Sequence, residues 1–165
     1  MQIGKPGNPV SHTTDCVRAP ASLVADQVQR GKFSFMTVQQ WVDAYAQAWR
    51  DRDADAAANL FTDDCLYRDH PLQEAHGGAE GVRSYWTEVT STQDRVDVRM
   101  GRPVESPDGR RAAVEFWVRM LNGGAEVTLI GILFLRFAED GRCEELRETW
   151  FFEPGDHAPH EGWGA

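Results

Sequence analysis

The sequence predicts an α+β domain in which helices pack on one face of a curved, mostly antiparallel sheet. Apolar residues recur at helical spacing between about residues 38 and 90, whereas from about residue 96 they alternate with a period of two. Turn signals at residues 106–109, 122–124 and 139–141 divide this second half into four strands. Helices followed by a strand meander is an order typical of α+β folds.

The first half of the domain predicts two helices in succession. Thr37 is suited to cap a helix of about 14 residues whose apolar positions recur at i, i+3, i+4 and i+7. These positions are Val38, Trp41, Val42, Tyr45, Ala48 and Trp49. Asp53 is suited to cap a second, short helix that continues through Leu60 and Phe61.

A short strand and a third helix come next. Residues 65–69 predict a strand that Pro71 ends, because proline has no backbone N–H to donate. After a loop that contains His76, the residues Val82, Tyr85, Trp86 and Val89 give a third amphipathic helix.

The four strands of the meander are predicted at residues 96–104, 112–121, 127–137 and 143 to about 153. In the second of them, one side carries Val114, Phe116, Val118 and Met120. We expect this apolar side to face a pocket, so that Glu115, Trp117 and Arg119 point outward, where they are candidates for a dimer interface.

The two ends differ from the domain between them. Residues 1–36 are rich in proline and glycine, and residues 1–35 hold four basic and two acidic side chains; we interpret residues 1–36 as an arm outside the core. The functional domain is expected at residues 37–154, and residues 155–165 are expected to form an irregular tail.

Composition excludes several classes of function. The net charge is −9, which disfavours nucleic acid and anionic membranes as partners. No apolar run approaches the length of about 18 residues that spans a bilayer, and no export signal is present, so we expect a cytoplasmic protein. The three cysteines are far apart, and the sequence has no metal-type spacing, P-loop, Gly-x-Gly-x-x-Gly or Gly-x-Ser-x-Gly motif. We expect reduced thiols, no metal and no cofactor.

Four features together carry a family resemblance. They are the tryptophan-rich first helix, Ala58-Asn59-Leu60-Phe61-Thr62-Asp63-Asp64 before the first strand, residues 77–86 in the third helix and residues 135–142 in the last hairpin. In order and spacing the chain resembles the NTF2-like superfamily, and more narrowly its SnoaL-like branch, between about residues 38 and 153. The resemblance implies a cone-shaped barrel whose helices close over the sheet around an apolar pocket, a hydrophobic small molecule as ligand, and a homodimer.

Two enzymes of that superfamily suggest candidate catalytic residues. Beside ketosteroid isomerase, Tyr45 resembles the oxyanion-binding tyrosine and Asp69 the general base, whereas Leu133 and Glu148 depart from its pattern. Beside limonene epoxide hydrolase, Tyr67 and Asp69 resemble a Tyr-x-Asn motif in the first strand. Arg147-Glu148 resembles that enzyme's Arg-Asp pair in the last strand.

Glu148 is the unusual residue of the last strand. It alternates with Leu146, Trp150 and Phe152, so it should project into the apolar interior, where an ionised carboxylate is costly unless it is paired or functional. The alternatives are a structural hydrogen-bonded acid or a bulge that turns it outward. For Asp69, the alternative to catalysis is a hydrogen bond to the turn that follows its strand.

The remaining candidates surround the expected pocket. His70 and His76 flank the loop at its rim, where a histidine could relay a proton, or both could be exposed loop residues. The candidate ligand-binding residues are Tyr67, Trp86, Phe116, Trp150, Trp41 and Trp49. The ordinary alternative for these aromatic residues is core packing.

The function that these residues favour is cofactor-independent acid–base chemistry on a hydrophobic carbonyl compound. Asp69 would remove a proton next to the carbonyl, Tyr45 would stabilise the enolate, and Glu148 or His70 would return the proton, giving isomerisation, cyclisation or dehydration. The alternatives are a protein that only binds a small ligand and, third, an epoxide hydrolase.

Overall fold

Residues 35–165 are described by a computed structural model, so the predicted arm at residues 1–36 lies almost entirely outside the described part. The helices are α2 (Val38–Asp51), α3 (Ala54–Ala58) and α4 (Gly78–Thr90). The strands are β1 (Phe61–Arg68), β2 (His76–Gly77), β3 (Gln93–Met100), β4 (Val104–Glu105), β5 (Arg111–Asn122), β6 (Ala125–Phe137) and β7 (Cys143–Pro154).

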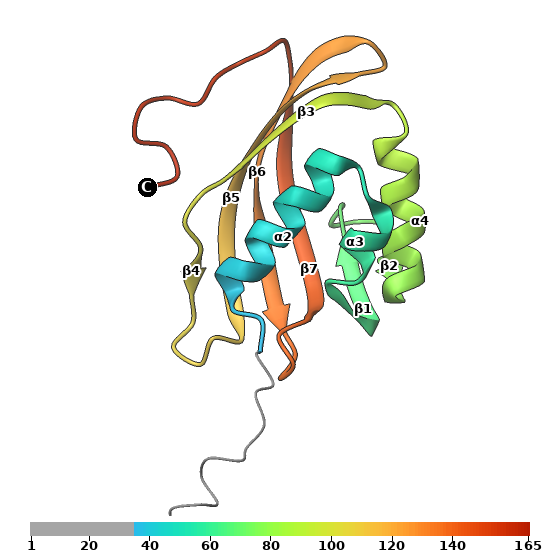
Figure 1. The fold of residues 1–165 in the computed structure, drawn as a ribbon, viewed down its shortest axis with the longest axis vertical. Coiled ribbons are helices and arrows are strands. Elements are labelled where there is room, and N and C mark those ends of the chain that lie inside the picture. The colour runs from blue at the N-terminus through green and yellow to red at the C-terminus, as the bar shows by residue number, and fades with distance from the viewer. Residues whose placement is uncertain (1–34) are drawn as a thin grey trace, which may run out of the picture. The chain divides into compact units, whose positions relative to one another are not determined.

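The strands form a single mixed sheet in the order β2-β1-β7-β6-β5-β3, with β4 paired to β5. The predicted antiparallel meander is confirmed, because β3, β5, β6 and β7 pair in succession. One pair is parallel, that of β1 with β7. The sheet curves under α2 and does not close, and α4 stands at its β1 side (Figure 1). This is the predicted α+β fold, with helices on one face of the sheet.

The first helix begins where the sequence places its cap. The Thr37 hydroxyl accepts a hydrogen bond from the Gln40 backbone N–H, and the Gln40 side chain accepts one from the Thr37 N–H, which forms a capping box. The helix ends at Arg52, whose backbone is left-handed with φ 56°. Asp53 then caps α3 by accepting from the Ala56 N–H.

Several predicted boundaries were wrong. Helix α3 ends at Ala58 rather than continuing through Phe61, and β1 begins at Phe61 rather than Cys65. The reason is tertiary, because Phe61 pairs with Cys143 of β7 and the Cys143 N–H donates to the Leu60 carbonyl. Residues 76–77, predicted as loop, form β2 against β1. The predicted strand at residues 96–104 is two strands, β3 and β4, with Pro103 in the gap between them.

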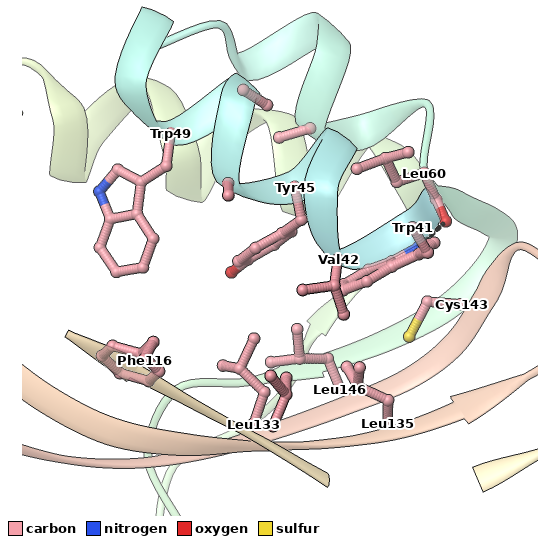
Figure 2. Close-up of a cluster of buried hydrophobic side chains, with 14 of the residues drawn as sticks. Trp41, Val42, Tyr45, Trp49, Leu60, Phe116, Leu133, Leu135, Cys143 and Leu146 are labelled. Carbon is pink, nitrogen blue, oxygen red and sulfur yellow. Dashed lines mark hydrogen bonds between the residues drawn. The ribbon is translucent and has the colours of Figure 1, made fainter. Parts of the chain in front are cut away.

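The inner face of the sheet and α2 together form the core. Figure 2 shows Trp41, Val42 and Tyr45 of α2 directed toward Leu133, Leu135 and Leu146 of the sheet. Gly131 in β6 is needed for this packing, because a Cβ built there would clash with the Thr149 backbone oxygen and lie 2.6 Å from Phe116 Cζ. The absence of a side chain at Gly131 leaves room for the Phe116 ring.

The outer face of β5 is covered by the C-terminal tail. As predicted, Val114, Phe116, Val118 and Met120 are buried on the inner face. On the outer face, the Trp117 indole N–H donates to the His157 carbonyl at 2.7 Å, and its ring lies edge-on to Trp163. Arg119 forms ion pairs with Asp97 and Asp156. Residues 155–165 form no helix or strand, yet they pack on the surface where a dimer contact was expected.

Candidate functional site

A cavity of about 580 Å³ lies between α2, α4 and the inner face of the sheet. Its lining is dominated by eight aromatic side chains from five elements, which are Tyr45, Trp49, Tyr67, Tyr85, Trp86, Phe116, Trp150 and Phe152. The other lining residues are Glu88, Val89, Thr90, Ser91, Thr92, Gln93, Met120, Asn122, Leu129 and Glu148. Such a space, with an aromatic wall and polar groups beside it, is suited to a small hydrophobic molecule that carries a polar group.

Glu148 is the one buried acid of this lining. As the alternation along β7 predicts, it faces inward with Trp150 and Phe152, and it is only 8% exposed. No bulge turns it outward, because β7 stays in register with β6 through the Leu133–Glu148 pair. Glu148 is absent from the ion pairs of residues 35–165, so hydrogen bonds are its polar contacts.

Two tyrosines connect Glu148 to the helix above it. The Tyr67 hydroxyl donates to Glu148 Oε2 at 3.2 Å, and the hydroxyls of Tyr45 and Tyr67 are 2.9 Å apart. Both tyrosines are fully or almost fully buried. Burial raises the pKa of each phenol well above 10, and the nearby Glu148 raises it further. Both hydroxyls therefore keep their protons over the physiological pH range and act as hydrogen-bond donors.

The carboxyl of Glu148 is tuned toward neutral pH. The pKa of Glu148 is raised from 4.5 to about 8, mainly by burial and to a smaller extent by the charge of Asp69. Hydrogen bonding from Tyr67, the second-largest influence, lowers the pKa, as do smaller contributions from Tyr85 and Trp150. Near pH 7 both forms of the carboxyl are accessible, which is the property of an effective general acid or base.

Asp69 occupies a different place from Glu148. It follows β1 directly, its side chain is 20% exposed, and Oδ1 lies 3.1 Å from His76 Nε2. The His76 ring in turn stacks on Tyr85, with centroids 4.3 Å apart and an interplanar angle of 27°. Asp69 does not line the cavity. Asp69 is the outer member of a series of contacts, Asp69–His76–Tyr85. The inner member, Tyr85, lines the cavity together with Glu148.

The other predicted site residues fall into two groups. Tyr45, Trp49, Tyr67, Trp86, Phe116 and Trp150 come together in the cavity lining. Trp41 and His70 lie elsewhere: the Trp41 indole N–H donates to the Leu60 carbonyl inside the packed core, and His70 Nδ1 accepts from the Leu72 N–H on the surface. Sequence reasoning missed Tyr85 as a site residue, although its helical spacing from Val82 placed it on the apolar face of α4.

Other expectations concern metals, thiols and membranes. Within residues 35–165, no group of three or more His, Cys, Asp and Glu side chains is placed to hold a metal ion. Cys65 and Cys143 are free and buried, and Cys16 lies outside the described residues. No helix in the described range is long and apolar enough to cross a membrane, and the cytoplasmic location stays a prediction.

A sheet covered by helices around an aromatic-lined cavity is also the arrangement that the comparisons with known proteins identify. Residues 42–146 match the family model of the SnoaL-like domain, and the chain belongs to this family, within the NTF2-like superfamily. No curated protein sequence matches the chain.

Solved structures with the same fold are distant in sequence. SalBIII, an epoxide hydrolase/cyclase-like enzyme in pyran ring formation in the polyether salinomycin, is 20% identical with a TM-score of 0.61, over 68% of this chain and 89% of its own. A protein from Catenulispora acidiphila with a ketosteroid isomerase-like fold, in complex with trimethylamine, is also 20% identical with a TM-score of 0.61, over 68% and 86%. An LEH-like epoxide hydrolase from Mycobacterium tuberculosis is 17% identical with a TM-score of 0.57, over 68% and 80%. At these identities the likeness establishes the fold alone.

Proposed function

We propose that this protein is an enzyme that carries out cofactor-independent proton transfer on a hydrophobic carbonyl compound, with isomerisation, cyclisation or dehydration as the outcome. The observation that carries the proposal is Glu148, a buried carboxyl that receives a hydrogen bond from Tyr67 and lies in an aromatic cavity. A titratable group of this kind, shifted by burial and set in a cleft, is typical of functional sites.

The chemistry follows from the two states of the carboxyl. Ionised Glu148 takes a proton from the carbon next to the substrate carbonyl, and the C–H electron pair moves to the carbonyl oxygen as an enolate. Glu148 is then neutral and accepts a weaker hydrogen bond from Tyr67. The Tyr67 hydroxyl can therefore donate its hydrogen bond to the enolate oxygen instead. Tyr45, hydrogen-bonded to Tyr67, supports that donor. Return of the proton to another carbon completes an isomerisation.

The proposal transfers the role of base from Asp69 to Glu148. Asp69 is paired with His76 and lies outside the cavity lining, whereas Glu148 lies in it. In this scheme Asp69 and His76 hold the Tyr85 ring, and His70 has no contact with the cavity.

Epoxide hydrolysis has weaker support. The resemblance to limonene epoxide hydrolase includes Arg147, but no arginine lines the cavity within residues 35–165. Arg147 is on the opposite face of β7, with its guanidinium 6.0 Å from the centre of the Phe134 ring.

Hydrogen–deuterium exchange tests the proposal without knowledge of the product. A panel of hydrophobic ketones is incubated with the protein in D2O, and deuterium gained next to the carbonyl is measured by mass spectrometry. We expect exchange that Glu148→Gln reduces by about 100-fold or more and that Asp69→Asn reduces far less. Loss of exchange in Asp69→Asn with retention in Glu148→Gln would contradict the assignment. Saturable binding of the ketones without exchange would favour the binding-only alternative.

We also propose that the protein is a homodimer. The outer face of the sheet exposes Ile132, Phe134 and Phe151 on the paired strands β6 and β7, beside the part that the tail covers. Size-exclusion chromatography with light scattering on the full chain tests this. We expect about twice the 18.5 kDa of the monomer, and Phe151→Asp is expected to give the monomer.

A further inference from the structure

The lining of the cavity is unbalanced in charge. Its two acidic residues are Glu148 inside and Glu88 on an exposed part of α4, and none of the lining residues within 35–165 is Lys, Arg or His. The chain as a whole carries −9. A cleft lined by one sign of charge concentrates ions of the opposite sign and repels its own. A carboxylate or phosphate ligand is therefore disfavoured in this cavity.

Glu148 has no cationic partner on the described part of the chain. Its neighbour Arg147 points to the other face of the sheet, against Phe134. His76, which stacks on Tyr85, is paired with Asp69. The groups that influence Glu148 are the hydroxyls of Tyr67 and Tyr85 and the indole of Trp150, which are neutral donors, and Asp69, which is negative. If Glu148 ionises, residues 35–165 supply no counter-charge, and an unpaired charge at this depth is costly.

The rings around Glu148 suit a positive charge. Trp49, Trp86 and Trp150 line the cavity together with five other aromatic residues, and aromatic faces attract ammonium groups through their quadrupoles. Such rings also accommodate a neutral body, which a hydrophobic ligand would present. A buried acid without a counter-ion and a dense aromatic wall are the two features of a site for organic cations.

We infer that the ligand of this cavity is a hydrophobic compound that carries a cationic nitrogen, which pairs with the Glu148 carboxylate. The inference deepens the proposed function and rests on it for the reaction, since the substrate becomes a carbonyl compound with an ammonium group. A cation beside a carboxyl favours its ionised form. Binding of such a substrate would therefore ionise Glu148, release its proton to solvent and leave the base ready to act.

Two probes of one shape and different charge test the inference. Phenyltrimethylammonium is a permanent cation, and tert-butylbenzene is its uncharged counterpart. Binding to the full chain is followed by quenching of tryptophan fluorescence, since three tryptophans line the cavity. We expect the cation to bind about tenfold or more tightly than the neutral probe, corresponding to about 1.4 kcal/mol.

Variants assign the preference to one acid. Glu148→Gln should lower the affinity for the cation about tenfold and leave that for tert-butylbenzene nearly unchanged. The matched control, Glu105→Gln, should change either affinity less than about threefold, because that side chain is exposed and lies outside the cavity lining. Equal affinities for the two probes, or a preference that persists in Glu148→Gln, would overturn the inference.

Calorimetry of the wild-type protein provides a test that needs no variant. Titrations at pH 7 in two buffers of different ionisation enthalpy should reveal proton release on binding of the cation and none on binding of the neutral probe. Absence of proton release with the cation would contradict the pairing with Glu148. Neither experiment requires turnover, so a cation preference without ketone exchange would sustain this inference while the proposed reaction fails.

Discussion

The two ends of helix α2 lie over very different interiors. At its start, Trp41 stacks on Tyr45 with centroids 4.9 Å apart, meets Phe61 and Phe137 edge-on at 5.7 Å each, and is completely buried. Two turns later, Trp49 lies beside the cavity with Trp86 and Phe116. Both residues belong to one apolar stripe. The contrast shows that the apolar stripe determines which side of α2 faces the sheet. The side chains opposite that stripe determine whether the space between helix and sheet is packed or left as a cavity.

The largest expected effect comes from the packed end. Trp41→Ala should lower the free energy of unfolding by about 3–5 kcal/mol, because it leaves a closed void and removes the hydrogen bond to Leu60. Trp49→Ala also removes an indole hydrogen bond, to Gln93 Oε1, but should cost less than Trp41→Ala, since the space it leaves joins an existing cavity. Urea denaturation of both variants measures the difference. Equal losses would mean that the two ends are packed alike.

The pH dependence of stability tests Glu148, which lies on β7 in the lining of the cavity. Its pKa is about 8 in the folded protein and 4.5 ordinarily, so the folded state binds the proton more tightly. The stability of wild type relative to Glu148→Gln should therefore fall as the pH rises from about 4.5 to about 8, by about 3–5 kcal/mol, and stay level above that. Denaturant titrations of the two proteins from pH 4 to pH 9 test this. A difference that grows in the opposite direction would show an ion-paired carboxylate.

A smaller effect is expected at Gly131, under the hollow end. Gly131→Ala would place a methyl group against the Thr149 backbone oxygen and the Phe116 ring, and overpacking of this kind costs about 1–3 kcal/mol. Displacement of Phe116 would also reshape the cavity floor. Denaturation measures the first effect and tert-butylbenzene binding the second. Gly124→Ala is the comparison variant, because a Cβ there has open space but the backbone φ is 85°. It measures the cost of backbone strain without the steric clash expected at Gly131.

The smallest expected effect concerns the hydroxyl that contacts Glu148. Tyr67→Phe removes a donor to the carboxylate, which should raise the pKa of Glu148 further and cost about 1 kcal/mol of stability. Phe at Tyr45, one hydroxyl further away, should shift the pKa of Glu148 less. Carbon-13 NMR of labelled glutamate measures both pKa shifts. An equal shift in the two variants would argue against direct contact of Glu148 with Tyr67 alone.

Much of this architecture could be predicted from the sequence. Period and turn chemistry predicted the helices, the meander and the inward orientation of Phe116 and Glu148, because these depend on local pattern. Pairing between segments that are distant in the sequence could not be predicted from local pattern. The start of β1, the strand β2 and the covering of Trp117 by the tail depend on such pairing and therefore differ from expectation. The same limit applies to the site, since the contact of Asp69 with His76 depends on how β2 folds back on β1.

The most direct test of the account is the titration of Glu148 itself. Carbon-13 NMR of the side-chain carboxyl, assigned with Glu148→Gln, should give a midpoint near pH 8 in the free protein. Addition of phenyltrimethylammonium should move that midpoint to lower pH. A midpoint near 4.5 in the free protein would contradict the central claim, because Glu148 would then be an ordinary ionised carboxylate rather than an acid–base group tuned by burial.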